Sequence, residues 1–210
     1  MRYAVLFALI VLSLLRQALS QDKVILISGD TIPVLVSGDP VKEGGISRRS
    51  MGFPNDYGFA RVVIIYPDDS IRVQLPGQIR GYYKKDGGRY LGSGYYESRE
   101  VDEKQLGYNR GQVKKVFFQR VAHHRDLTIW YYREHVGEAI PERYFFFEKK
   151  DVEAPDMIYS YRDWLRWAAA NPPFDTIRQK IPPTSKGKRR EYSLFKYFQD
   201  VMKRYKEMKP

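Results

Sequence analysis

Short runs of β-branched and aromatic residues, each bounded by glycine, proline or aspartate, recur along most of this chain. Such runs predict strands, and the residues between them predict hairpin turns. The predicted hairpins pair residues 23–27 with 31–36, 61–66 with 70–75, 79–83 with 89–96, and 113–122 with 127–133. A further strand is predicted at 143–148. Pro33 cannot donate to a strand ladder, so we expect its strand at a sheet edge.

The pattern becomes helical after Pro155. Ser160, with Asp163 three residues later, is typical of a capping box at a helix N-terminus. The expected helix carries its apolar residues on one face and ends before the prolines at 172–173; these residues are Trp164, Leu165, Trp167 and Ala168. A short helix is expected near 175–181. Apolar residues at helical spacing from Leu194 to Tyr205 predict an amphipathic helix, which either docks on the β body or lies on a membrane surface.

These patterns predict a mainly β fold, α+β overall. Antiparallel hairpins form a barrel- or sandwich-like body over residues 21–154, and a basic helical segment covers 155–210. The polar stretches at 37–58 and 97–111 are expected to be loops.

The N-terminus has the features of a secretory signal peptide. Arg2 precedes an apolar stretch from Tyr3 to Leu15, which is shorter than the roughly 20 residues that span a membrane. Ala18 and Ser20 place small residues before a cut, so Gln21 is the expected mature N-terminus; the alternative is an uncleaved anchor. We therefore expect an exported protein in the periplasm, at the outer-membrane periphery or outside the cell, with no transmembrane span in the mature chain.

Positive charge is concentrated near the C-terminus. The formal net charge is +11, and residues 155–210 contribute +7 of it. Four cations fall within one segment that has no large apolar residue: Lys186, Lys188, Arg189 and Arg190. They predict a weak, salt-sensitive contact with an envelope protein, an anionic polysaccharide or a lipid head group. Export argues against nucleic acid, and the alternative is a solvated face that only aids solubility.

No residue pattern identifies a catalytic, cofactor-binding or metal-binding site. The absence of cysteine excludes disulfides, thiolate metal sites and a thiol nucleophile. All three histidines fall at 123, 124 and 135, but the predicted strand from Leu127 separates the last from the others by more than about 20 Å, too far for one zinc ion. A glycosidase that uses two converging carboxylates stays open.

Tyrosine is abundant, with 17 residues, and several occur as adjacent pairs on predicted strands. Alternation sends one member of each pair to each face of a sheet. We assign Tyr83 and Tyr96 to the surface, where they bind a protein partner or stack on sugars. The alternative is ordinary use of tyrosine in strands.

The order of these parts resembles a family of exported β-rich proteins of Bacteroidota. The segment Gln21–Ile32 (QDKVILISGDTI) looks like the opening of such proteins, and the strands at 116–121 and 127–133 and two closing helices are similar. Ser28 stands where asparagine is usual, and the glycine- and proline-rich stretch after Gly38 is longer. The resemblance implies export and architecture but no activity. We expect a non-enzymatic envelope protein that binds a macromolecular partner, or alternatively a carbohydrate-binding module or small glycan-active enzyme.

Overall fold

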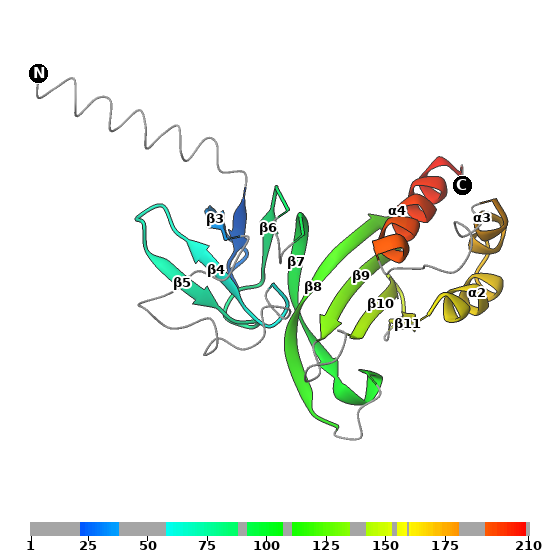
Figure 1. The fold of residues 1–210 in the computed structure, drawn as a ribbon, viewed down its shortest axis with the longest axis horizontal. Coiled ribbons are helices and arrows are strands. Elements are labelled where there is room, and N and C mark those ends of the chain that lie inside the picture. Colours follow the sequence, from blue (N-terminus) through cyan, green and yellow to red (C-terminus); the bar gives the residue numbers. More distant parts are fainter. Residues whose placement is uncertain are drawn as a thin grey trace, which may run out of the picture. The chain divides into compact units, whose positions relative to one another are not determined.

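The computed structural model describes residues 22–37, 58–87, 92–106, 111–134, 142–152, 155–158, 160–180 and 192–208. The chain divides into two compact units (Figure 1). Unit 1 comprises residues 1–118 and 134–141, and unit 2 comprises residues 119–133 and 142–210. The helices expected after residue 155 therefore share a compact unit with strands.

Unit 1 is built from antiparallel hairpins. Its elements are β1 (Lys23–Ile25), β2 (Thr31–Pro33), β3 (Leu35–Val36), β4 (Val62–Ile65), β5 (Ile71–Gln74), β6 (Gly81–Lys84), β7 (Gly94–Asp102), the 3₁₀ helix η2 (Glu103–Leu106) and the first residues of β8 (Val113–His124). Its strands hydrogen-bond in the orders β8-β7-β6-β1-β2 and β3-β4-β5. The three hairpins predicted here are present, but the strand predicted at 31–36 divides into β2, which pairs with β1, and β3, which pairs with β4 in the other sheet. β2 lies at a sheet edge, as Pro33 predicted.

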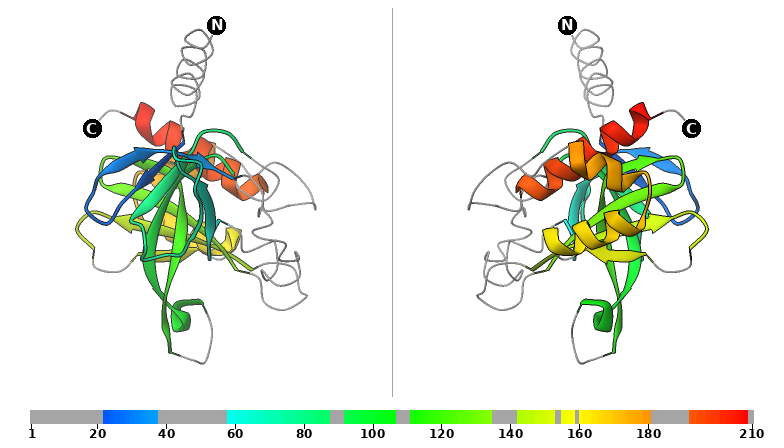
Figure 2. Two further views of the ribbon diagram at one scale, coloured as in Figure 1. Left: turned by 90° about the vertical axis from the view of Figure 1, so that its left-hand side faces the viewer. Right: turned by 90° about the vertical axis from the view of Figure 1, so that its right-hand side faces the viewer.

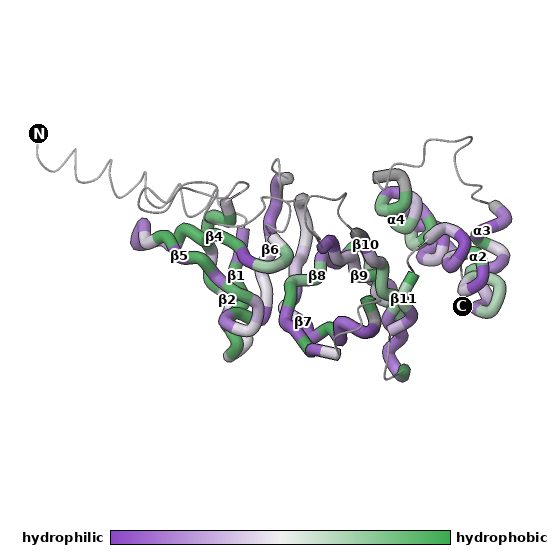
Figure 3. Tube along the Cα trace, turned by 60° about the horizontal axis from the view of Figure 1, so that its bottom comes forward, coloured by the Kyte–Doolittle hydropathy of each residue, from purple (hydrophilic) through white to green (hydrophobic). Residues whose placement is uncertain are grey.

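The length of β7 differs from the sequence prediction, whereas the β4–β5 hairpin agrees with it. β7 continues to Asp102, where a loop was expected to begin at residue 97, because residues 94–102 pair along a longer strand than their polarity suggests. The β4–β5 turn is closed by Asp68, whose Oδ1 accepts from the Ser70 amide at 3.0 Å. β4 is apolar throughout and green in Figure 3, as expected for a strand that is largely buried.

Unit 2 is a small sheet covered by helices. Its further elements are β9 (Leu127–Glu134), β10 (Glu142–Lys149), β11 (Asp156–Ile158), α2 (Tyr161–Ala170), α3 (Phe174–Lys180) and α4 (Tyr192–Glu207). The strand order is β11-β10-β9-β8, and the helices lie over one face of these strands (Figure 2). The fourth predicted hairpin and the strand at 143–148 are confirmed, and β11 was not predicted.

The helix predictions are also confirmed. The Ser160 hydroxyl accepts from the Asp163 amide at 3.3 Å, and the Asp163 carboxylate accepts from the Ser160 amide at 2.9 Å, which completes the capping box. Helix α2 has apolar and polar colours in Figure 3 and buries its apolar face. The prediction that α4 docks on the β body is confirmed, because Phe198, Val201 and Met202 are buried against the strands of unit 2.

An aromatic cluster forms the centre of unit 2. The ring of Phe147 on β10 lies 5.6 Å from Trp164, 4.7 Å from Trp167 and 5.2 Å from Phe198, measured between centroids. Each of these rings buries a large apolar area, and the ring–ring contacts, of which Phe147–Phe198 is edge-to-face, add a smaller stabilisation. The cluster therefore ties α2 and α4 to the same strand.

The overall class is mainly β with C-terminal helices, as predicted. The sheets formed by the described strands are open and do not close into a barrel. Among the described helices, none is both long enough and apolar enough to cross a membrane.

We predict that Phe198→Ala destabilises unit 2 by about 3–5 kcal/mol, because it removes a fully buried ring from the aromatic cluster and leaves a cavity in its place. The three tryptophans of the chain all lie in unit 2, so thermal unfolding followed by tryptophan fluorescence reports this change. Gln199→Ala, at the adjacent exposed position of α4, should leave the midpoint nearly unchanged. Equal effects of the two substitutions would show that α4 does not dock through this face.

Candidate interaction surface

One face of the unit 1 sheet presents a row of side chains that crosses four strands. The register places Pro33 opposite Lys23, Lys23 opposite Tyr83, and Tyr83 opposite Tyr95. Pro33, Lys23 and Tyr83 are exposed, and Tyr95 is half-buried. We call these four residues the tyrosine row. Tyr83 keeps 40 % of its surface accessible, so part of one large aromatic side chain is open to a ligand or partner.

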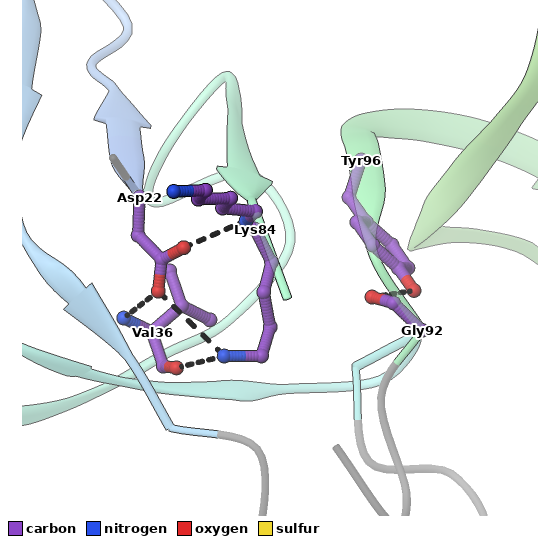
Figure 4. Close-up of polar contacts among 6 residues, drawn as sticks. Asp22, Val36, Lys84, Gly92 and Tyr96 are labelled. Atoms are coloured by element: carbon purple, nitrogen blue, oxygen red, sulfur yellow. Dashed lines mark hydrogen bonds and ion pairs between the residues drawn. The ribbon is translucent and has the colours of Figure 1, made fainter. Parts of the chain in front are cut away.

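The prediction that Tyr96 lies on the surface is wrong. Its neighbours in the register are Tyr82 and, one strand further, Val24, and all three are fully buried on the opposite face. The Tyr96 ring stacks on the Tyr82 ring with centroids 4.5 Å apart. Both hydroxyls are satisfied inside unit 1. Tyr82 donates to the Gly58 carbonyl at 2.6 Å, and Tyr96 donates to the Gly92 carbonyl at 3.1 Å (Figure 4). The outward tyrosine of that pair is Tyr95.

Gly81 leaves room for the side chain of Tyr95. A Cβ atom at residue 81 would lie 2.3 Å from the Tyr96 carbonyl oxygen and 3.4 Å from the Tyr95 hydroxyl. The backbones of β6 and β7 therefore approach too closely for any residue but glycine here. The phenol of Tyr95 extends toward Gly81. It lies on the same face as Tyr83, its direct partner in the register.

A buried ion pair fixes the two strands that carry Lys23 and Tyr83. Asp22 and Lys84, each adjacent to one of these residues, lie 3.6 Å apart with side chains less than one-tenth exposed (Figure 4). The Asp22 carboxylate accepts from the Val36 amide at 3.0 Å and the Lys85 amide at 2.7 Å, and the Lys84 ammonium donates to the Val36 carbonyl at 2.7 Å. Both charges are thus hydrogen-bonded as well as paired, which a buried ion pair requires.

The predicted hairpin placed His123 and His124 in its turn, and this prediction is wrong, because both lie on β8. His123 and His124 end β8 opposite Thr128 and Leu127, and only Arg125 and Asp126 form the turn, Arg125 with φ 54°. His123 Nδ1 lies 2.8 Å from the Thr128 hydroxyl. Desolvation, followed by the charges of Arg125 and Lys206, holds the pKa of His124 below its usual value. His135 lies outside the described residues, and no cluster of three potential metal ligands occurs among those described.

The four basic residues of the C-terminal segment, Lys186, Lys188, Arg189 and Arg190, lie outside the described residues, as does the N-terminal stretch 1–20. Of the residues that the sequence predicted for partner contact, Tyr83 is therefore the one that the structure places at the surface, and it belongs to the tyrosine row. The sequence did not identify Tyr95, Lys23 or Pro33 as members of it. The signal that could have found them is the apolar residue Val24, whose burial fixes Lys23 and Tyr83 on the other face once the register is known.

Comparison with known proteins leaves the tyrosine row as the main guide to function. The chain has no significant match among protein-family models, curated proteins or solved structures. Inferences about function must therefore come from the chemistry of its own surfaces.

We predict that Asp22→Ala costs about 3–5 kcal/mol, because it leaves the Lys84 ammonium buried without its charge partner and two amides without an acceptor. Hydrogen exchange at the Val36 and Lys85 amides should accelerate together. The double variant Asp22→Ala/Lys84→Met should recover part of the loss, because no buried charge then remains. If the double variant is as unstable as the sum of the two single variants, the two side chains do not act as a pair.

Proposed function

We propose that this chain is an exported binding protein of the cell envelope, without catalytic activity, and that the tyrosine row is its contact surface for a protein partner. The observation that carries the proposal is the register that aligns Lys23, Tyr83 and Tyr95 on one face of unit 1. Residues 1–20 support export, because they have the charge, length and small residues of a signal peptide.

The composition of the row suits a protein interface. Tyrosines supply large apolar area with few rotatable bonds and a polar end, and they are enriched among the residues that dominate binding energy. Lys23 lies directly opposite Tyr83 and adds a charge at the same surface. The buried pair beneath it holds the backbone of both strands, so little conformational freedom is lost when a partner binds.

The basic segment at 186–190 supports a second, weaker contact with an acidic surface. Its four cations lie within five residues, so an anionic partner relieves their mutual repulsion. Ion pairs formed in water are individually worth about 0–1 kcal/mol and are screened by salt. The segment therefore adds to association without determining which partner binds.

We predict that the mature protein begins at Gln21 and is recovered from the envelope or medium fraction. N-terminal sequencing of the purified protein from its source cells tests this directly. Ser20→Arg places a bulky charge at the cut and should leave the precursor unprocessed. A protein that retains Met1 and stays with the cytoplasmic fraction would contradict the export part of the proposal.

We predict that Tyr83→Ala/Tyr95→Ala lowers partner recovery about tenfold or more, since truncating central interface aromatics is costly. Affinity purification of the tagged full chain from crosslinked envelopes, quantified by mass spectrometry, measures this loss. Ile71→Ala is the matched control, because Ile71 is an exposed apolar residue of unit 1 outside the row. Equal recovery with the double variant and with Ile71→Ala would contradict the assignment of this surface.

A carbohydrate-binding role is the alternative, and the exposure of Tyr83 is the observation that favours it. A sugar ring stacks on an aromatic face and does not require the hydroxyl. Binding on a glycan array that survives Tyr83→Phe and disappears with Tyr83→Ala would favour this alternative over a protein partner.

A further inference from the structure

The register of β9 and β10 brings two arginines together in unit 2. These neighbouring strands are joined by seven residues, too few for a parallel crossover, so they pair antiparallel. The Tyr131 ring lies 5.2 Å from the Phe145 ring, and the Tyr132 ring lies 6.1 Å from the Tyr144 ring. Both contacts give the same register. One residue further along that register, Arg133 lies opposite Arg143.

Directly opposed residues of antiparallel strands have Cβ atoms about 4.5–5.5 Å apart, and like charges at that separation are destabilising. The two guanidinium groups are close enough to interact, because desolvation lowers the pKa of Arg143 and the charge of Arg133 lowers it further. Both also act on Tyr131: burial raises the pKa of that phenol, and the two arginines oppose the rise. The three side chains therefore form one local group.

This group faces the helical side of the sheet. Side chains alternate along a strand, so Arg133 shares a face with Tyr131, and Arg143 shares one with Phe145. Tyr131 packs against Phe195 of α4 at 5.6 Å, whereas Tyr205, near the other end of α4, contacts Asp126 at the β8–β9 turn. The arginines therefore lie toward the N-terminal end of α4, whose first turn has no acidic residue.

We propose that Arg133, Arg143 and the Tyr131 hydroxyl bind a phosphate group. Each guanidinium presents a planar fork that fits two oxygens of an oxyanion. A carboxylate has only two oxygens and is satisfied by one fork, whereas a phosphate monoester offers oxygens to both and carries about two negative charges at neutral pH. Both arginines are half-buried, so an ion pair here is screened less than one at the surface.

The site goes beyond the proposed protein-binding surface and does not depend on it, because the tyrosine row belongs to unit 1 and these residues to unit 2. Each arginine also has at least one other interaction within the chain. Soluble phosphate, a phosphorylated sugar and a phospholipid head group present the same chemical group, so the experiment must distinguish these sources.

The test is a titration of the full-length mature chain with inorganic phosphate at constant ionic strength, followed by calorimetry and by thermal unfolding. We expect saturable binding and a higher unfolding midpoint with phosphate than with chloride or acetate. Arg133→Gln and Arg143→Gln should each weaken binding about tenfold or more, the loss expected for a charge-assisted contact. Tyr131→Phe keeps the ring contacts with Phe145 and Phe195 and should weaken binding by less.

Arg204→Gln is the matched control, because Arg204 is an exposed arginine of α4 whose ion pair with Glu207 is local. It should leave the affinity unchanged. Glycerol 3-phosphate and vesicles that contain phosphatidic acid, compared with vesicles of phosphatidylcholine alone, identify the source of the phosphate. Absence of saturable phosphate binding, or an equal loss with Arg204→Gln, overturns the proposal. So does a large fall in the unfolding midpoint of phosphate-free Arg133→Gln, since the arginine would then serve an internal partner.

Discussion

Cross-strand register is the constraint on which both candidate surfaces depend. Side chains alternate between the faces of a sheet, so a slip of one residue exchanges the interior set for the exterior one. In unit 1 the stacking of Tyr82 on Tyr96 fixes the interior, and Lys23, Tyr83 and Tyr95 lie on the opposite face as a consequence. In unit 2 the Tyr131–Phe145 contact fixes the interior in the same way and leads to the arginine pair. The surfaces are thus set by packing on the opposite side or further along the strand.

The register of unit 1 is protected by features that allow no alternative. Asp22, just before β1, forms a buried ion pair with Lys84 at the end of β6, and a slipped pairing would bury at least one charge without its partner. A buried ion pair adds little net stability compared with apolar residues of the same size, but breaking it is expensive, and this asymmetry favours one register. The close approach of the strands at Gly81 has a similar effect, because the neighbouring residue Tyr82 could not occupy that position.

Local patterns predicted the elements well, and non-local pairing explains what they missed. The hairpins and the capping box at Ser160 follow from residues close together in sequence, and they were predicted. β11 has only three residues, Asp156–Ile158, and forms by pairing with β10, so its own pattern is too short to indicate a strand. The assignment of Tyr96 failed for a related reason: alternation shows that Tyr95 and Tyr96 face opposite sides, but only the partner strand decides which side is buried.

The arginine pair shows why net charge along a segment is a poor guide to local field. Residues 21–154 carry a net charge of only +2, yet the β9–β10 register places two of their cations side by side. The basic segment at 186–190 is the reverse case, with high charge density that is visible in the sequence alone. A run of cations close together in sequence attracts many anions weakly and is screened by salt, whereas two half-buried forks in fixed register select an anion by its shape. Selectivity in this protein is therefore expected where the fold positions a few charges, and not where the sequence accumulates most of them.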